Sequence, residues 1–259
     1  METLYLFTSY SLSPSLTITT LHYCPPPMMV GHQLTTVGQC ARAVCSKVWG
    51  VQEEYTLCLN CKHASQRWYF DTEIEIINDD ILKVSEDKIS DQKLSVFGNL
   101  PYNISTEILS KWILNVGSNF WFESLILMFQ KEVADRIISE FNRSKYGRLS
   151  ILSSWKLNVK KIIDIKPQSF SPRPKIDSSL LLFTPKENFF ELKDPKNLEK
   201  ITRIFFSQRR KMLKKPFNQV FANGKQVAEK FGIDLNLRPQ NLEPETYYKL
   251  VKEYEDLRS

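Results

Sequence analysis

The sequence of 259 residues has few glycines, no long apolar run and only a small excess of one charge sign. No stretch approaches the ~20 consecutive apolar residues that a membrane-spanning helix requires. The hydrophobic share of 42% and the charged share of 25% are ordinary for a globular chain, which excludes a collagen-like or mostly disordered protein. The length fits one large domain or two modest ones. The net charge of +6 permits a polyanionic partner without requiring one.

Charged side chains are scarce in the segment 1–70, which carries four cations and three acids. The segment 71–259 carries 31 cations and 26 acids, a much higher density. The first part also lacks a regular hydrophobic period and is interrupted by three consecutive prolines at 25–27. The two parts are therefore different kinds of sequence, and we predict that residues 1–70 are an atypical, poorly ordered segment.

All five cysteines lie in this first part, at positions 24, 40, 45, 58 and 61. Cys58 and Cys61 form a CxxC pair, and with Cys40 and Cys45 they would supply four thiolates for a tetrahedral zinc. The spacing is irregular and the turn glycines of such a site are absent, so we predict no metal. No positively charged segment precedes the first apolar residues, so we expect a reducing compartment without disulfides. The predicted location is the cytoplasm, with an organelle as the alternative.

After the first part, strand-like and helix-like segments alternate. Residues 73–77, 94–97 and 124–129 have the apolar patterns of strands, and the last of these is a continuous run typical of a strand buried on both faces. Residues 105–116 and 130–139 repeat their apolar side chains with a helical period. This alternation predicts an α/β domain with a parallel sheet.

A late strand at residues 178–183 closes the α/β domain, which we place at residues 71–185. We predict a small all-helical domain over residues 186–259. Asp194 followed by Pro195 is a good helix start, with a capping carboxylate and then proline at the first helical position. The apolar stripe predicted for this helix runs through Leu198, Ile201, Ile204, Phe205, Met212 and Leu213.

The tetrad Asn99-Leu-Pro-Tyr102 directly follows a predicted strand and precedes a predicted helix, where open α/β sheets bind their ligands. An exocyclic amine of a nucleobase is a poor nucleophile because its lone pair is delocalised into the ring. An Asn side-chain oxygen and the carbonyl of Leu100, aimed by Pro101, would both accept from that amine. Tyr102 offers a flat face for an extruded base. The alternative is a loop that merely turns the chain.

Several neighbouring segments carry a more specific pattern. They are Asn78–Leu82, Val96–Ile104, Leu127–Ile137, Tyr146–Ser150, Phe170–Ser178 and Phe205–Met212. Together these segments resemble the small-subunit ribosomal RNA adenine dimethyltransferases, often called the KsgA family. The resemblance covers residues 71–259 in the family's order and does not extend to residues 1–70. The tetrad alone would also admit a DNA adenine-N6 methyltransferase, whereas the later segments exclude most of those.

The resemblance implies an S-adenosylmethionine-dependent enzyme with a Rossmann-like methyltransferase domain and a small helical C-terminal domain. Such an enzyme transfers two methyl groups to N6 of each of two adjacent adenosines near the 3′ end of small-subunit rRNA. Its partner would be that rRNA or the pre-ribosomal small subunit. We expect a monomer that requires neither a membrane nor a metal.

The resemblance also implies roles for single residues. Asp80, at a strand end, would bind the adenine end of the cofactor, and Asn99 would lie between the cofactor and the target amine. Leu100, Pro101 and Tyr102 would form the rest of the catalytic base site. Phe170 would close on the other face of the target adenine, the alternative being an ordinary core aromatic.

Basic residues near these segments are candidates for RNA contact. Arg148, Arg173 and Lys175 lie in predicted loops near the site, and Arg209, Arg210, Lys211, Lys214 and Lys215 follow the apolar stripe of the predicted helix. Such clusters contact phosphates in RNA-binding proteins. The alternative is a solvated helix face.

The segment 1–70 departs from the family pattern. The family's cofactor site begins with a Gly-Gln-Asn-Phe-like segment, followed by a strand that ends in a glycine-rich turn, through which the backbone approaches the cofactor. Here the only glycines are Gly31, Gly38 and Gly50, widely separated. Translation of another reading frame, or a mis-assembled gene start, explains the change at residue 71 better than divergence does. We expect weak S-adenosylmethionine binding and an unfilled flank beside the Asn99 strand.

Two alternatives of other classes stay open at this point. A non-catalytic RNA-binding or ribosome-assembly factor would use the basic residues without the cofactor. A DNA adenine-N6 methyltransferase would use the tetrad on duplex DNA. Binding of S-adenosylmethionine separates the first alternative from an enzyme, and methyl transfer to rRNA against duplex DNA separates the second.

Overall fold

The structure is a computed structural model that describes residues 2–7, 16–22, 74–86, 89–170 and 174–258. In the strands before residue 79 the description is limited to the backbone. The five cysteines, and with them the prediction of no metal, lie outside the described residues. Within the described ranges, no helix is long and apolar enough to cross a membrane.

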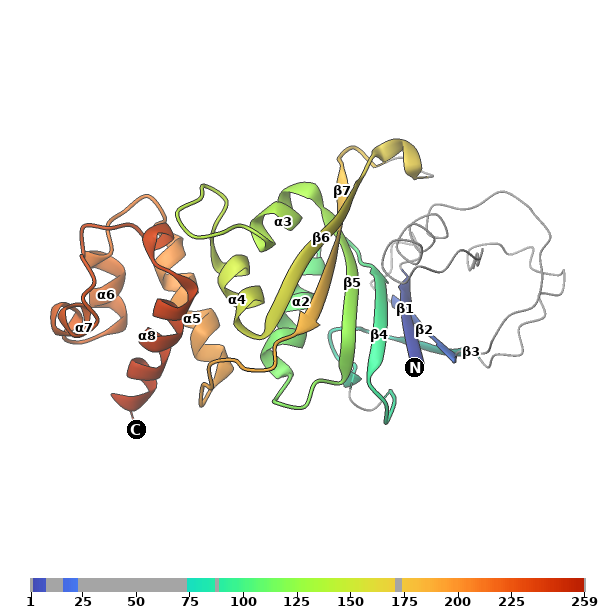
Figure 1. The fold of residues 1–259 in the computed structure, drawn as a ribbon, viewed down its shortest axis with the longest axis horizontal. Helices are drawn as coiled ribbons and strands as arrows, with labels where there is room; N and C mark the ends of the chain where they lie inside the picture. The colour runs from blue at the N-terminus through green and yellow to red at the C-terminus, as the bar shows by residue number, and fades with distance from the viewer. Residues whose placement is uncertain (1, 8–15, 23–73, 87–88, 171–173, 259) are drawn as a thin grey trace, which may run out of the picture. The chain divides into compact units, whose positions relative to one another are not determined.

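Seven strands form one mixed sheet with the order β3-β2-β1-β4-β5-β7-β6 (Figure 1). The strands are β1 (Glu2–Phe7), β2 (Leu16–His22), β3 (Ile74–Asp79), β4 (Leu94–Asn99), β5 (Phe122–Gln130), β6 (Leu157–Ile165) and β7 (Ser178–Pro185). Strand β4 runs parallel to both of its neighbours, β1 and β5. Strand β2 is antiparallel to β1 and β3, and β7 is antiparallel to β5.

Strand β5 is buried on both faces, as its continuous apolar run predicts. All five residues of Leu125–Phe129 are at most 4% exposed. Because successive side chains of a strand alternate between faces, Ile126 and Met128 point to the same face. On that face they form a buried cluster with Ile165 and Leu180.

The predicted parallel sheet is correct for β4 and β5 and wrong for β7. Neighbouring strands become parallel when a crossover helix connects them. Between β6 and β7 the described residues hold only the three-residue 3-10 turn η2 (Pro167–Ser169). The sequence does not predict β6, because Lys160, Lys161 and Asp164 interrupt its apolar pattern. This strand is the last in the sheet order.

Strand β1 lies beside β4, on the flank that we expected to be unfilled. The two strands pair from Glu2 opposite Leu94 to Leu6 opposite Gly98, so that expectation is wrong. Strands β1 and β2 are antiparallel and only residues 8–15 separate them, too few for the crossover helix of a βαβ unit. Residues 8–15 contain no glycine and lie outside the described residues, as do 23–70.

The chain forms two compact units. The first comprises Met1–Ile108, Ser118–Lys131 and Lys160–Phe183, and the second comprises Leu109–Gly117, Glu132–Val159 and Thr184–Ser259. The described α-helices are α2 (Ser105–Asn115), α3 (Lys131–Ile137), α4 (Arg148–Lys156), α5 (Pro195–Ser207), α6 (Lys214–Val220), α7 (Gly224–Lys230) and α8 (Pro244–Asp256). The domain limits that we place at residues 70 and 185 stay predictions.

In the second unit, α5 begins as predicted and ends earlier than predicted. The Asp194 carboxylate accepts from the Lys196 N–H at 3.0 Å, which confirms the N-cap. The helix ends at Ser207, so the stripe predicted through residues 212 and 213 is wrong. Met212 is 55% exposed in the following turn, whereas Leu213 is buried and donates its N–H to the Leu237 carbonyl at 2.9 Å.

Aromatic side chains form much of the core of the second unit. The ring of Phe205 on α5 meets Phe217 of α6 edge to face, with centroids 5.3 Å apart, and Tyr247 of α8, with centroids 5.5 Å apart. Edge-to-face contacts of this kind add to the stabilisation from burial. Because these rings come from three different helices, their contacts join α5, α6 and α8.

Lys156, at the end of α4, is an ionisable side chain inside the second unit. It is 3% exposed, and its ammonium donates to the carbonyls of Ile113 and Val116, at 3.2 and 2.5 Å. The ammonium also lies 4.1 Å from the ring centroid of Trp155. Burial lowers the pKa of Lys156 to about 8. The lysine thus bonds the Ile113 carbonyl in the last turn of α2, where the helix leaves carbonyls unpaired, and the Val116 carbonyl just after the helix.

A test of the core concerns Tyr146, which is 1% exposed and whose hydroxyl has no hydrogen-bond partner among the described residues. A buried unpaired hydroxyl destabilises the folded state, so Tyr146→Phe should raise the free energy of unfolding by about 1 kcal/mol. The matched control is Tyr247→Phe, which loses the bond from its hydroxyl to the Pro239 carbonyl at 2.7 Å and should be less stable. Urea denaturation measures both, and a loss of stability in Tyr146→Phe would contradict the expectation.

Candidate active site

The tetrad Asn99–Tyr102 lies at the carboxyl end of β4, as predicted. Asn99 is the last residue of the strand and is paired with Met128 of β5. Gly98 permits close packing just before it, since a Cβ there would lie 2.7 Å from a side-chain carbon of Leu127. Leu127 is fully buried, so it has little room to move away. The glycine therefore lets β4 approach β5 where the site begins.

Hydrogen bonds fold the tetrad into the start of α2. The Pro101 carbonyl accepts from the Ile104 N–H at 3.1 Å, and the Tyr102 carbonyl accepts from the Ser105 hydroxyl at 3.2 Å. Leu100 is buried and anchors the turn. The Asn99 side chain is half-exposed and makes no hydrogen bond to another described residue. Its oxygen and amide are therefore available to a ligand.

Two aromatic residues attach to the same face of the sheet at the start of β7. The Tyr102 hydroxyl lies 2.5 Å from the hydroxyl of Ser178. Phe170, half-buried, packs against the cluster that contains Leu180. Ser178 and Leu180 are two residues apart on one strand and thus point to one face. The rings of Tyr102 and Phe170 are both held to that face near the strand that carries Asn99.

Asp80 directly follows β3. Since β2 is antiparallel to both β3 and β1, and β1 is parallel to β4, the carboxyl ends of β3 and β4 lie at one edge of the sheet. The pairing registers put these two ends nearly level. Two strands separate them, so they lie about 14 Å apart. Asp80 and Asn99 are thus at one edge, separated by about three strand spacings.

The Asp80 carboxylate is partly engaged by its own turn. One oxygen accepts from the Leu82 N–H at 3.0 Å, and the other lies 3.5 Å from the Lys83 ammonium. The side chain remains 38% exposed. A carboxylate has more acceptor positions than these two contacts use, so Asp80 can also accept from a ligand.

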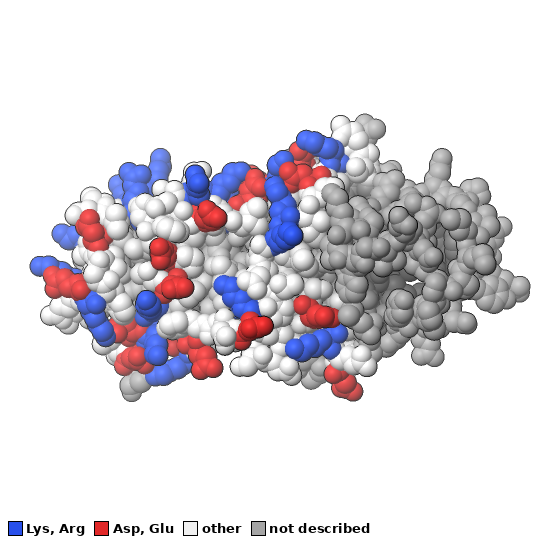
Figure 2. Space-filling view, viewed as in Figure 1, with Lys and Arg blue, Asp and Glu red and all other residues white. Residues whose placement is uncertain are grey.

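The predicted basic residues divide between the two units. Lys175 belongs to the first and is exposed, and Arg173 lies outside the described residues. Arg148, of the second unit, is the first residue of α4, so its predicted loop position is wrong, and it pairs with Glu199 at 3.3 Å. In the same unit, Arg209 donates to the Ser144 carbonyl, and Arg210 and Lys211 are exposed in the turn after α5. Figure 2 shows Lys and Arg interspersed with Asp and Glu on the visible face rather than gathered in one patch.

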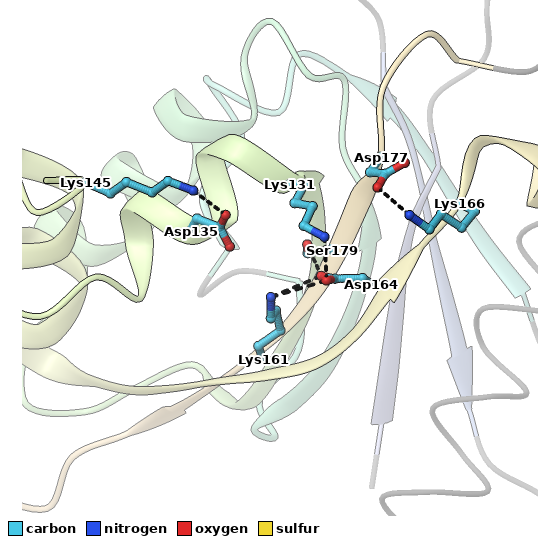
Figure 3. A network of polar contacts seen from close by, with 8 residues as sticks. All are labelled: Lys131, Asp135, Lys145, Lys161, Asp164, Lys166, Asp177 and Ser179. Carbon is cyan, nitrogen blue, oxygen red and sulfur yellow. Dashed lines mark hydrogen bonds and ion pairs between the residues drawn. The ribbon is translucent and has the colours of Figure 1, made fainter. Parts of the chain in front are cut away.

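A polar network that the sequence does not predict lies where β5 meets α3 (Figure 3). The Asp164 carboxylate accepts from the Lys131 ammonium at 2.8 Å, from Lys161 at 3.2 Å and from the Ser179 hydroxyl at 2.6 Å. The bonds from Lys131 and Ser179 hold the pKa of Asp164 well below its ordinary value. Lys166 pairs with Asp177 nearby, at 2.9 Å. No local pattern predicts these contacts, because they join residues of several segments.

Comparison with known proteins decides the family. A sequence profile of the ribosomal RNA adenine dimethylases matches residues 55–256. The chain belongs to this family. Its reaction class is therefore methylation of rRNA adenine, with S-adenosylmethionine as the methyl donor. Family membership confirms the resemblance found in the sequence and favours rRNA over duplex DNA as substrate.

Individual relatives agree with the profile. The chain is 92% identical over 189 residues to ribosomal RNA small subunit methyltransferase A of Pelagibacter ubique, covering 73% of this chain and 72% of that protein. The protein of the same name from the Wolbachia of Drosophila simulans is 40% identical over 182 residues, covering 70% and 66%. The chain thus spans between about two thirds and three quarters of these relatives' length.

A solved structure shows the same fold. The crystal structure of a dimethyladenosine transferase from Plasmodium falciparum superimposes with a TM-score of 0.52 at 27% sequence identity. The superposition covers 62% of this chain and 66% of that one. It confirms the predicted Rossmann-like methyltransferase fold.

The contacts of Asp164 are expected to make the stability of the protein depend on pH. The folded pKa of Asp164 lies below its ordinary value of 3.8, so its contribution to stability is present above that pH and is lost as the pH falls through the folded pKa. Asp164→Asn should therefore be about 1 kcal/mol less stable than the parent at pH 7. The difference should shrink below pH 4. Denaturation at pH 7, 5 and 3 checks this, and a difference that grows on acidification would contradict it.

Proposed function

We propose that this chain is built to dimethylate N6 of two adjacent adenosines near the 3′ end of small-subunit rRNA. The observation that carries the proposal is the tetrad turn at the carboxyl end of β4, where the Asn99 side chain makes no hydrogen bond to another described residue. The name of the Pelagibacter relative, at 92% identity, supports the small-subunit target. We further propose that the protein acts as a monomer in the cytoplasm.

In this proposal the tetrad prepares the target amine for attack. The Asn99 oxygen and the Leu100 carbonyl accept from the amine hydrogens, so that the nitrogen lone pair turns out of the ring toward the methyl donor. Pro101 fixes the backbone that aims the Leu100 carbonyl. When bound, S-adenosylmethionine supplies an electrophilic methyl group. The residues therefore need only orient the amine, which after methyl transfer loses its proton to solvent, and no covalent intermediate with the protein forms.

The fit of the cofactor to the described residues is partial. Asp80 and Asn99 lie at one sheet edge, where Asp80 would accept from the adenine amine of S-adenosylmethionine. The sequence of residues 8–15, which follows β1, contains no glycine. Without glycine, the side chains would oppose a close approach of the backbone to the cofactor. We therefore propose that this chain binds the cofactor more weakly than relatives with the glycine-rich turn.

Tyr102 and Phe170 would enclose the target adenine between their rings. Both are held to one face of the sheet at the start of β7. Phe170 is only half-buried although it packs on the apolar cluster, so part of its ring remains available. The proposal assigns phosphate contacts to Arg148, Arg173, Lys175, Arg209, Arg210 and Lys211.

Asn99→Ala tests the assignment of the amine acceptor. The variant removes an acceptor used in the transition state, so we expect methyl transfer to fall at least about 100-fold. The assay uses tritiated S-adenosylmethionine and under-methylated small subunits. Gly117→Ala is the matched control, since the site is open and no atom lies within 4 Å of the added carbon. Full activity of Asn99→Ala would refute the assignment.

The assay needs a chain that binds the cofactor. Calorimetric titration of the present chain with S-adenosylmethionine is therefore made first. If binding is weaker than micromolar, the Asn99→Ala comparison is made in a chain whose segment 1–70 is replaced by the N-terminal part of the Pelagibacter relative. RNA binding without any cofactor binding in either chain would favour a non-catalytic RNA-binding factor.

The exposed basic residues between the end of α5 and the start of α6 can be tested by salt dependence. Arg210, Lys211 and Lys214 are exposed, and their replacement by Ala should reduce the slope of log affinity against log salt by about 0.7 to 0.9 per lost phosphate contact. The matched control replaces three other exposed lysines, Lys196, Lys225 and Lys249, with the same change in charge. Filter binding to rRNA at several salt concentrations measures both. Equal slopes in the two triple variants would show that these three residues are solvated and do not contact phosphates.

A further inference from the structure

The hydroxyl of Tyr102 is held by a residue far away in the sequence. It lies 2.5 Å from the hydroxyl of Ser178, 76 residues later. Tyr102 is half-buried, whereas Ser178 has no exposed surface. The phenol thus reaches from a partly open position to a buried polar group. A hydrogen bond at the tip restrains the direction of the ring axis. Because the phenolic O–H prefers the plane of its ring, the bond also favours one rotation about that axis, which the side-chain torsion alone leaves broad.

Ser178 is itself firmly placed. It is the first residue of β7 and is paired with Gln130 at the end of β5. The ladder continues one residue further, since the Lys131 N–H donates to the Asp177 carbonyl at 2.9 Å. The serine is therefore flanked by main-chain pairing on both sides. Its hydroxyl is a fixed point against which another side chain can be positioned.

The backbone of Tyr102 is fixed independently of this contact. The Ser105 hydroxyl donates to the Tyr102 carbonyl at 3.2 Å, and the preceding Pro101 carbonyl accepts from the Ile104 N–H at 3.1 Å. The Cα–Cβ bond of the tyrosine is thus set by the turn, and the far end of its ring is set by Ser178. Two fixed ends define the axis of the ring, and the preference of the phenolic O–H for the ring plane favours one rotation of the ring about that axis.

We propose that Ser178 is a positioning residue for methyl transfer, which orients the Tyr102 ring as the surface on which the target adenine stacks. The inference rests on the proposed function, because it takes Tyr102 as part of the base site. It adds a residue outside the tetrad and a physical role for a buried hydroxyl. Pre-set rings lose less entropy when a base stacks on them.

The neighbouring serine provides a matched control. Ser179 is equally buried, and its hydroxyl bonds Asp164 at 2.6 Å rather than Tyr102 (Figure 3). Consecutive residues of a strand point to opposite faces. Ser178→Ala and Ser179→Ala therefore make the same chemical change at adjacent buried positions, and only the first removes the contact to the tyrosine.

The experiment measures base stacking directly, without methyl transfer. The full chain is mixed with a small-subunit rRNA fragment that carries 2-aminopurine at a target adenosine, and fluorescence quenching and RNA affinity are recorded. We expect Ser178→Ala and Tyr102→Phe each to lower the ratio of stacked to unstacked base about five-fold, the effect of one hydrogen bond. RNA affinity should change little. The double variant should equal either single variant, since both remove the same bond.

The remaining variants distinguish a wrong base site from a wrong positioning role of Ser178. Tyr102→Ala removes the ring and should lower the quenching to what Phe170 alone supplies. If the parent shows no quenching, or Tyr102→Ala retains it in full, the base site itself is wrong and the inference falls with it. If Tyr102→Ala lowers the quenching while both Ser178→Ala and Tyr102→Phe match Ser179→Ala and the parent, only the positioning role is overturned. If Ser178→Ala does not fold, Tyr102→Phe alone tests the positioning role. It removes the same hydrogen bond at the less buried of the two residues.

Discussion

The candidate site depends on strand β5, which is buried on both faces and paired on both edges. One edge holds β4, which carries Asn99, and the other holds β7, which begins with Ser178. Leu125–Phe129 are almost wholly inaccessible to solvent, so the strand cannot shift without exposing apolar surface. The main-chain pairing of β5 therefore sets the position of the tetrad relative to the start of β7. The contact between Tyr102 and Ser178 is a consequence of that register.

Polar side chains around the sheet are held by different means on its two faces. On one face, Ser178 meets the uncharged hydroxyl of Tyr102, next to an apolar cluster that also receives Phe170. On the other, Ser179 and Lys131 bond the Asp164 carboxylate. A neutral contact beside the aromatic rings suits the base-binding face that we propose, because an unpaired buried charge there would oppose the stacking of an uncharged base. The ion pairs instead join β6 to the beginning of α3.

Strands β1 and β2 complete the strand order of the sheet, while the sequence between them lacks the glycines that the family resemblance implies for the cofactor turn. Strands β1 and β2 fill the places between β4 and β3, and they do so as an antiparallel pair. The backbone pairing is satisfied, and Asp80 reaches the same sheet edge as Asn99. A close approach of the backbone to the cofactor needs glycine in the turn, and strand pairing does not supply it. Sheet completion and cofactor binding are thus separate requirements in this fold.

The sequence by itself determined the parts that depend on local pattern. The buried run of β5, the cap at Asp194 and the tetrad after β4 follow from periodicity, capping chemistry and turn residues near one another in the chain. The tertiary structure alone decided the antiparallel pairing of β7, the end of α5 at Ser207 and the burial of Lys156. It also decided the meeting of Tyr102 with Ser178. These features arise from contacts between segments far apart in the chain. Such contacts can override the structure that the local sequence of a segment favours, and a local pattern therefore does not predict them.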